Sequence, residues 1–207
     1  MPGPQINVIN NSDNDRLHIA IYQKPDGGPF PIVAWRVISL CGGSTAYMPA
    51  PISYAVQVRY DRGGASYRTK CAPIQGFRGA FLVTGEENCV KVTEMTDVSP
   101  GDGVAVKSDP NVEFPVGACI VLGGDPVFGP VNINRNTMAV FRIRPQLFYA
   151  AKIDDAGLDN GSFLDAEKLT ATEVEVRPYQ TIVVTGDKEA GYSLNVKEGL
   201  DSVECGV

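Results

Sequence analysis

The chain has 207 residues, of which 43% are hydrophobic and 20% are charged, and its formal net charge is −6. These values are ordinary for a globular protein, and no stretch approaches the roughly 18 uninterrupted apolar residues of a membrane span. A negative surface repels phosphate backbones and the basic residues form no stripe, which argues against nucleic acid as a partner. We therefore expect a soluble protein that does not cross a membrane, folded as one domain over residues 1–207.

Alternating apolar and polar residues, interrupted by Gly, Pro, Asn and Asp, dominate the chain and are typical of half-buried strands joined by turns. The clearest alternation lies in residues 52–60, where five apolar side chains point to one side. In chain order, strands are expected at residues 5–10, 17–23, 32–39, 52–60, 80–84, 89–94, 103–107, 118–122, 137–143, 147–153, 173–177, 180–185 and 192–196.

Helical periodicity is weak throughout, because no window longer than about ten residues carries an unbroken 3.6-residue apolar stripe. This disfavours a βαβ architecture with parallel strands. One short helix is expected within residues 162–169, with Ser162 as its N-cap. The pattern predicts an all-β, antiparallel two-sheet β-sandwich of jelly-roll or Greek-key type, with at most one or two short helices and no internal repeat.

Residues suited to catalysis are scarce. His18 is the only histidine, and its alternation with Leu17 and Ile19 places it on the opposite strand face, as an ordinary solvent-facing or hydrogen-bonded side chain. There is no Gly-x-Ser-x-Gly motif to present a serine, and no Cys-x-x-Cys or His-x-His pair to hold zinc. We therefore expect a protein that is not an enzyme.

The five cysteines are widely spaced and odd in number, which is unlike a disulfide scaffold. Reduced thiols in a cytoplasm are the simpler interpretation, with Cys119 as a small buried hydrophobe. The N-terminus lacks the basic and apolar regions of a signal peptide. We expect a cytoplasmic protein, or one released without a visible signal peptide.

Acidic loops are the candidate metal sites, since hard cations bind carboxylate and carbonyl oxygens supplied by flexible loops. Asp154, Asp155 and Asp159 are the candidate ligands for calcium, although Gly157 breaks the register of an EF-hand loop. The favoured alternative is that these residues form ordinary surface turns without any cofactor. The same three carboxylates are the candidates for the remaining enzyme hypothesis, a carboxylate-based hydrolase.

Aromatic residues are the candidate ligand contacts. Trp35, Phe148 and Tyr149 are the residues that we expect to stack on a ligand, because exposed rings form stacking platforms in sugar-binding sandwiches. For Trp35, a core position between the two sheets is the favoured alternative.

Six short segments carry a resemblance to a known family, namely Ile6-Asn-Val-Ile-Asn-Asn-Ser12, Ile19-Ala-Ile-Tyr-Gln23, Val33-Ala-Trp35, Val116-Gly-Ala-Cys-Ile120, Arg142-Ile-Arg-Pro145 and Phe148-Tyr149. They resemble the RhiA-like family of rhizosphere-expressed proteins, and the likeness covers about half the chain. The resemblance implies a microbial β-sandwich protein made in quantity, with no established enzymatic activity and no catalytic residues.

Strand density, turn-rich loops and the scarcity of catalytic residues favour a non-catalytic protein that acts by ligand binding or self-association. Exposed sheet edges make a homo-oligomer the expected assembly. The alternative is a lectin-like module that binds a glycan or lipid, assisted by calcium.

Overall fold

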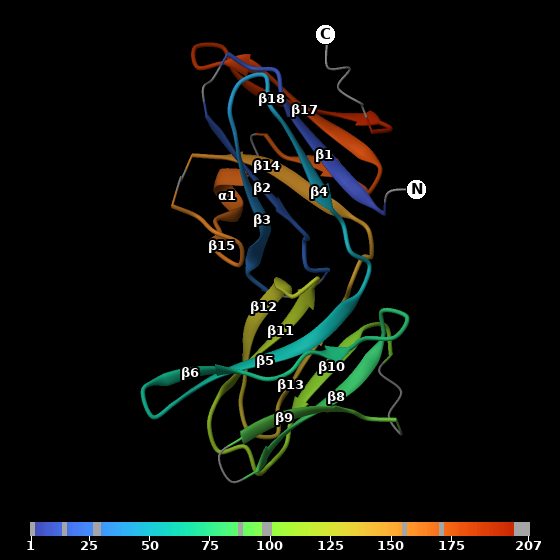
Figure 1. The fold of residues 1–207 in the computed structure, drawn as a ribbon. Coiled ribbons are helices and arrows are strands. Elements are labelled where there is room, and N and C mark those ends of the chain that lie inside the picture. The colour runs from blue at the N-terminus through green and yellow to red at the C-terminus, as the bar shows by residue number, and fades with distance from the viewer. Residues whose placement is uncertain are drawn as a thin grey trace. The chain divides into compact units, whose positions relative to one another are not determined.

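A computed structural model describes residues 3–13, 16–26, 30–86, 89–96, 101–154, 157–169 and 172–200. The chain forms two compact units, and Figure 1 labels most of their strands. Unit 1 contains Met1–Tyr22, Ala34–Pro51 and Gln146–Val207, and unit 2 contains Gln23–Val33 and Ile52–Pro145. The expectation of a single domain stays a prediction. The described residues include no helix with the length and apolar character needed to cross a bilayer.

Unit 1 is a sandwich of two sheets. In the first, the strands lie in the order β18 (Gly191–Glu198), β17 (Gln180–Asp187), β1 (Gln5–Asn10) and β4 (Thr45–Pro49). In the second, the order is β16 (Val174–Val176), β14 (Phe148–Ile153), β2 (Leu17–Tyr22) and β3 (Ile32–Leu40), with β15 (Phe163–Leu164) paired to β3. Its core includes Ile6, Ile19, Trp35 and Ile182, all without exposed surface.

Unit 2 is a second sandwich. One sheet has the order β13 (Met138–Phe141), β10 (Val104–Ser108), β8 (Gly79–Glu86) and β9 (Cys89–Glu94). The other has the order β12 (Asp125–Ile133), β11 (Val116–Leu122), β5 (Tyr54–Arg62) and β6 (Ala65–Arg68), with β7 (Ala72–Pro73) paired to β5. Its core includes Val56, Phe81, Val106 and Ile120.

The two units share one scheme of strand pairing. Six pairs in unit 1 have a counterpart of the same direction in unit 2, namely β1/β17 with β10/β8, β1/β4 with β10/β13, β17/β18 with β8/β9, β2/β14 with β11/β5, β2/β3 with β11/β12, and β14/β16 with β5/β7. Apart from β6 and β15, strands β1–β9 are therefore repeated in order by β10–β18, and each unit takes its strands from both repeats. The expectation of no internal repeat is wrong at the level of strand order.

The correspondence extends to single residues. Matching backbone hydrogen bonds are Asn10 N to Ser44 O (2.9 Å) and Asn11 N to Val184 O (2.8 Å) in unit 1, and Ser108 N to Thr137 O (2.9 Å) and Asp109 N to Val83 O (2.9 Å) in unit 2. A short stretch of similar sequence accompanies these hydrogen bonds, since Val83-Thr-Gly-Glu86 in β8 corresponds to Val184-Thr-Gly-Asp187 in β17.

The predicted fold class is confirmed, because nearly every described element is a strand of a sandwich and the one described helix, α1 (Ala166–Leu169), has four residues. Its N-cap differs from the prediction: Asp165 Oδ1 accepts from the Glu167 N–H at 3.1 Å, whereas Ser162 Oγ accepts from the Asp159 N–H at 3.0 Å. Two pairings, β1/β17 and β8/β10, are parallel without a helical crossover among the described residues.

Candidate functional site

The hairpin of β5 and β6 carries a cluster of basic residues and extends beyond the neighbouring strands of unit 2 in Figure 1. We call residues 59–70 the basic hairpin, since they contain four basic residues and one acidic residue. The strands pair Arg59 with Arg68 and Tyr60 with Tyr67, and Gly63 and Gly64 turn the chain with positive φ angles of 59° and 78°. A cationic arm thus projects from a protein whose net charge is negative.

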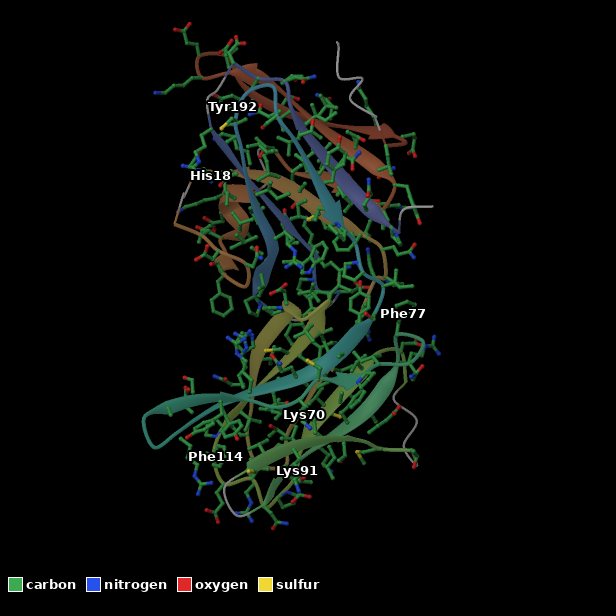
Figure 2. The ribbon with its side chains drawn as sticks, viewed as in Figure 1. His18, Lys70, Phe77, Lys91, Phe114 and Tyr192 are labelled. Atoms are coloured by element: carbon green, nitrogen blue, oxygen red, sulfur yellow. The ribbon has the colours of Figure 1, made fainter. Side chains whose placement is uncertain are left out.

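One face of the basic hairpin is aromatic. Tyr60 stacks on Tyr67 with 5.2 Å between ring centroids, and the Phe114 ring lies 5.8 Å from Tyr60. The Arg62 guanidinium lies 5.9 Å from the centroid of Phe114, which is labelled in Figure 2. Cross-strand aromatic pairs and cation–π contacts each stabilise such a pairing by about 0.5–1 kcal/mol. These contacts stiffen the arm although every residue of β6 is exposed.

The other face of the basic hairpin holds two arginines, because successive side chains of a strand point to opposite faces. Arg59 and Arg68 are direct cross-strand partners, and like charges in that position repel. Among the described residues neither guanidinium forms an ion pair, and the Nε of Arg59 is buried with no hydrogen-bond partner. A buried charged donor without a partner is unfavourable, so this face favours the arrival of an anion.

A hollow lies beside Arg59 and Arg68, because the residue next to Arg59 on the neighbouring strand is a glycine and has no side chain. Gly117 is the cross-strand partner of both Arg59 and Asn132, and a Cβ added to it would lie 2.9 Å from the Pro130 Cβ. The resulting open hollow has a volume of about 670 Å³ and is bordered by both arginines and by the aromatic residues of the hairpin. This volume accommodates an anionic group and the molecule that carries it.

Two titratable residues near the arginines are Cys119 and Asp61. Burial raises the pKa of the Cys119 thiol to about 11, against the opposing effect of Arg59 and Arg68, so at neutral pH it is protonated. Asp61 accepts a hydrogen bond from Ser66 Oγ at 2.5 Å on the exposed surface.

The aromatic residues predicted to bind a ligand lie elsewhere, in unit 1. Trp35 and Phe148 stack on each other with 5.0 Å between centroids, and both are buried in the core. Tyr149 is half-buried and stacks on Tyr22 at 6.0 Å. A buried ring has no face for a ligand, so Trp35 and Phe148 are core residues, as the alternative for Trp35 proposed.

The predicted calcium ligands are not brought together in the described structure. Asp154 forms an ion pair with Lys152, its side chain is otherwise exposed, and Asp155 lies outside the described residues. Asp159 takes part in a turn through its backbone N–H, which donates to Ser162 Oγ. In the part of the chain that is described, no three His, Cys, Asp or Glu side chains gather as a metal site would require.

His18, labelled in Figure 2, lies half-buried on β2. Its Nδ1 is 2.8 Å from the Ser39 hydroxyl on the neighbouring strand, so the residue is a hydrogen-bonded cross-strand partner. No carboxylate contact to His18 is present among the described residues that would complete a catalytic triad.

Comparison with known proteins gives no relative: no protein-family model, no curated protein and no solved structure matches this chain. The RhiA-like resemblance therefore stays a prediction.

The sequence alone did not indicate the basic hairpin as a site, because the basic residues of the chain form no stripe. The available signal was the mirrored order Arg59-Tyr60 and Tyr67-Arg68 on either side of Gly63-Gly64. In an antiparallel hairpin that order places arginine opposite arginine and tyrosine opposite tyrosine.

Proposed function

We propose that this protein acts by binding and not by catalysis, and that the arginine face of the basic hairpin holds an anionic group of its ligand. The observation that carries the proposal is the buried, unpartnered Nε of Arg59, opposite Arg68 and beside the hollow floored by Gly117. Two guanidinium groups bind sulfate, phosphate or carboxylate oxygens through paired N–H donors, with geometry that lysine does not match.

Anion binding is favourable because it neutralises the charges of Arg59 and Arg68. In the free protein the two guanidinium groups repel, and an anion between them replaces repulsion by two charge-assisted interactions. Asn132, which is exposed at the rim of the hollow, offers further hydrogen bonds to the body of the ligand.

The experiment uses sulfate as the probe and the free energy of unfolding as the readout. Sodium sulfate is compared with sodium chloride at equal ionic strength for the wild type, Arg59→Gln, Arg68→Gln and the control Arg135→Gln, which lies in the exposed turn before β13. Bound sulfate at ten times its Kd stabilises the folded protein by about 1.4 kcal/mol.

We expect the sulfate-specific stabilisation in the wild type and in Arg135→Gln, and its loss in the two hairpin variants. The general salting-out effect of sulfate is common to all four proteins and cancels in the comparison. An equal gain in all four would contradict the proposal.

A further inference from the structure

The hollow beside Arg59 and Arg68 contains a hydrogen-bond acceptor as well as two cations. Asp61 follows Arg59 by two positions on β5, so its side chain lies on the same face of the hairpin, about 7 Å further along the strand. Its Oδ1 accepts from the hydroxyl of Ser66, its cross-strand partner, whereas its Oδ2 has no hydrogen-bond partner among the described residues. Because an ionised carboxylate only accepts hydrogen bonds, this oxygen is suited to a hydroxyl group of a ligand.

The far side of the hollow offers an amide, beyond an apolar floor. Asn132 is the cross-strand partner of Gly117, which is itself the partner of Arg59, so Asn132 lies two strand spacings, about 10 Å, from Arg59. Its exposed amide both donates and accepts hydrogen bonds. Between the two, the ring carbons of Pro130 border the space that a side chain on Gly117 would occupy, since a Cβ there would lie 2.9 Å from the Pro130 Cβ. A ligand that reaches from Arg59 to Asn132 therefore crosses an apolar surface.

The net charge of the hollow matches one carboxylate. Of the described residues that line it, the charged ones are Arg59, Arg68 and Asp61, with a net charge of +1. Guanidinium groups bind a carboxylate through two parallel N–H bonds, and one carboxylate leaves the hollow neutral. A more highly charged group, such as a phosphate monoester, is less suited to the hollow because Asp61 repels its additional charge.

The fold itself does not require this set of side chains. The corresponding connection of unit 1 joins β14 to β16, as the segment with β6 joins β5 to β7, and its residues 154–173 contain six acidic residues and no arginine. The same strand pairing therefore forms with and without paired arginines. Since the pair Arg59 and Arg68 is unfavourable in the free protein, a ligand explains its presence better than the stability of the sandwich does.

We propose that the ligand is an acidic oligosaccharide and that one of its uronic acid units occupies the hollow. The inference rests on the proposed anion site and names the class of molecule that carries the anion. A uronic acid has one carboxylate, which pairs with Arg59 and Arg68, and several hydroxyl groups, one of which donates to Asp61. Asn132 binds another hydroxyl group, and the C–H face of the sugar ring packs on Pro130. Since the hollow is open, with a volume of about 670 Å³, neighbouring sugar units extend into solvent.

Chemical-shift titration of the isotope-labelled protein at constant ionic strength measures the Kd. The probes are four trisaccharides, built from galacturonic, glucuronic, mannuronic and guluronic acid, because the four differ in the directions of their hydroxyl groups. Two controls accompany the trisaccharide that binds most tightly. Its methyl ester keeps the hydroxyl groups and lacks the charge, and propane-1,2,3-tricarboxylate keeps three carboxylates and lacks hydroxyl groups. We expect at least one trisaccharide to bind at least tenfold more tightly than either control.

The variant Asp61→Ala separates a sugar from a simple anion. Repulsion between unit charges about 7 Å apart in water amounts to roughly a threefold effect on affinity, whereas a hydrogen bond to a charged group is worth about tenfold or more. We therefore expect Asp61→Ala to weaken binding of the trisaccharide at least threefold and to strengthen binding of sulfate at least threefold. Arg59→Gln weakens both, and the control Arg135→Gln weakens neither. Asp61 is exposed, so we expect its variant to fold.

Three results would each overturn this inference: no binding of any of the four trisaccharides, equal binding of either control, or trisaccharide binding that Asp61→Ala leaves unchanged or strengthens. Its failure is distinguishable from failure of the proposed function. Sulfate-specific stabilisation that depends on Arg59, without binding of any uronic acid, would sustain the anion site and reject the sugar as the carrier of the anion.

Discussion

Units 1 and 2 have the same strand pairings but differ in the connection that follows their corresponding central strands, β14 and β5. In unit 2 this connection is a hairpin with paired arginines and stacked tyrosines, whereas in unit 1 it is an acidic segment with a short strand, a helix and an exposed phenylalanine. The comparison indicates that buried residues determine the strand pairing. Binding properties depend on the connecting segments, whose sequences can differ without disturbing the core.

Corresponding core positions provide the first test of the equivalence of the units, with the largest expected effect. Phe81 in β8 and Ile182 in β17 are both buried and occupy matching places in the parallel pairs. Phe81→Ala is expected to lower the free energy of unfolding by about 3–5 kcal/mol and Ile182→Ala by about 2–5 kcal/mol. Denaturant titration measures both, with exposed Met138→Ala as the control. A loss below 1 kcal/mol at either core position would argue against the matching.

Two corresponding glycines test how closely the backbones of the two units match. Gly85 and Gly186 each follow the same Val-Thr pair, but Gly186 has a φ of 103° and a Cβ there would lie 2.1 Å from the Gly191 carbonyl oxygen. At Gly85 the nearest atom is 3.6 Å away. We expect Gly186→Ala to destabilise by about 2–4 kcal/mol and Gly85→Ala to change stability by less than about 1 kcal/mol, measured by thermal unfolding. Equal effects would show that the backbone of the two strands is alike at these positions.

Each unit also buries one titratable side chain of high pKa, Cys119 in unit 2 and Tyr22 in unit 1. Burial raises the pKa of Tyr22, and its hydrogen bond to Glu173 raises it further. For Cys119 the pKa is raised from 9.0 to about 11, so the folded state retains a proton that the unfolded state loses. Stability is therefore expected to fall as pH rises from about 9 to 11, by about 2–3 kcal/mol from this group.

Cys119→Ala isolates that contribution, because Tyr22 is present in both proteins and affects both equally. The free energy of unfolding of Cys119→Ala should fall less steeply over the same alkaline range in urea titrations. Parallel pH profiles for the variant and the wild type would be evidence that the thiol is not coupled to folding.

The smallest expected effect concerns repulsion within the basic hairpin. Arg68→Gln removes the like-charge partner of Arg59 and is expected to stabilise the ligand-free protein by about 0.2–1 kcal/mol at low salt. Thermal unfolding in dilute buffer measures the gain, which should vanish in 0.5 M sodium chloride, where the Debye length is about 4 Å. Destabilisation would mean that Arg68 makes a favourable contact in the absence of ligand.

Much of the fold could be predicted from the sequence, because the alternation of apolar and polar residues indicates which side of a strand is buried. The strand limits Gln5–Asn10 and Cys89–Glu94 agree with prediction to the residue. Of the strands that were not predicted, β12 contains Pro126 and the Gly129-Pro130 pair, residues that indicate turns, and its pairing with β11 is irregular at that point. The repeat in strand order was missed because matching strands share burial and only a four-residue echo of sequence.

The candidate site could not be predicted, since its properties arise from pairing across strands. Arg59 and Arg68 are nine positions apart, and only the hairpin register places them together beside Gly117. Trp35 and Phe148 are residue types that often stack on ligands, which is why they were predicted to bind one. Their burial follows from the packing of β3 and β14.

The most direct test of the central claim, anion binding by the basic hairpin, is the NMR signal of the Arg59 Nε–Hε group during titration with sodium sulfate at constant ionic strength. We predict a saturable shift of this signal, accompanied by Arg68 and absent for Arg135. A signal that moves no more than that of Arg135 over the whole titration would contradict the account.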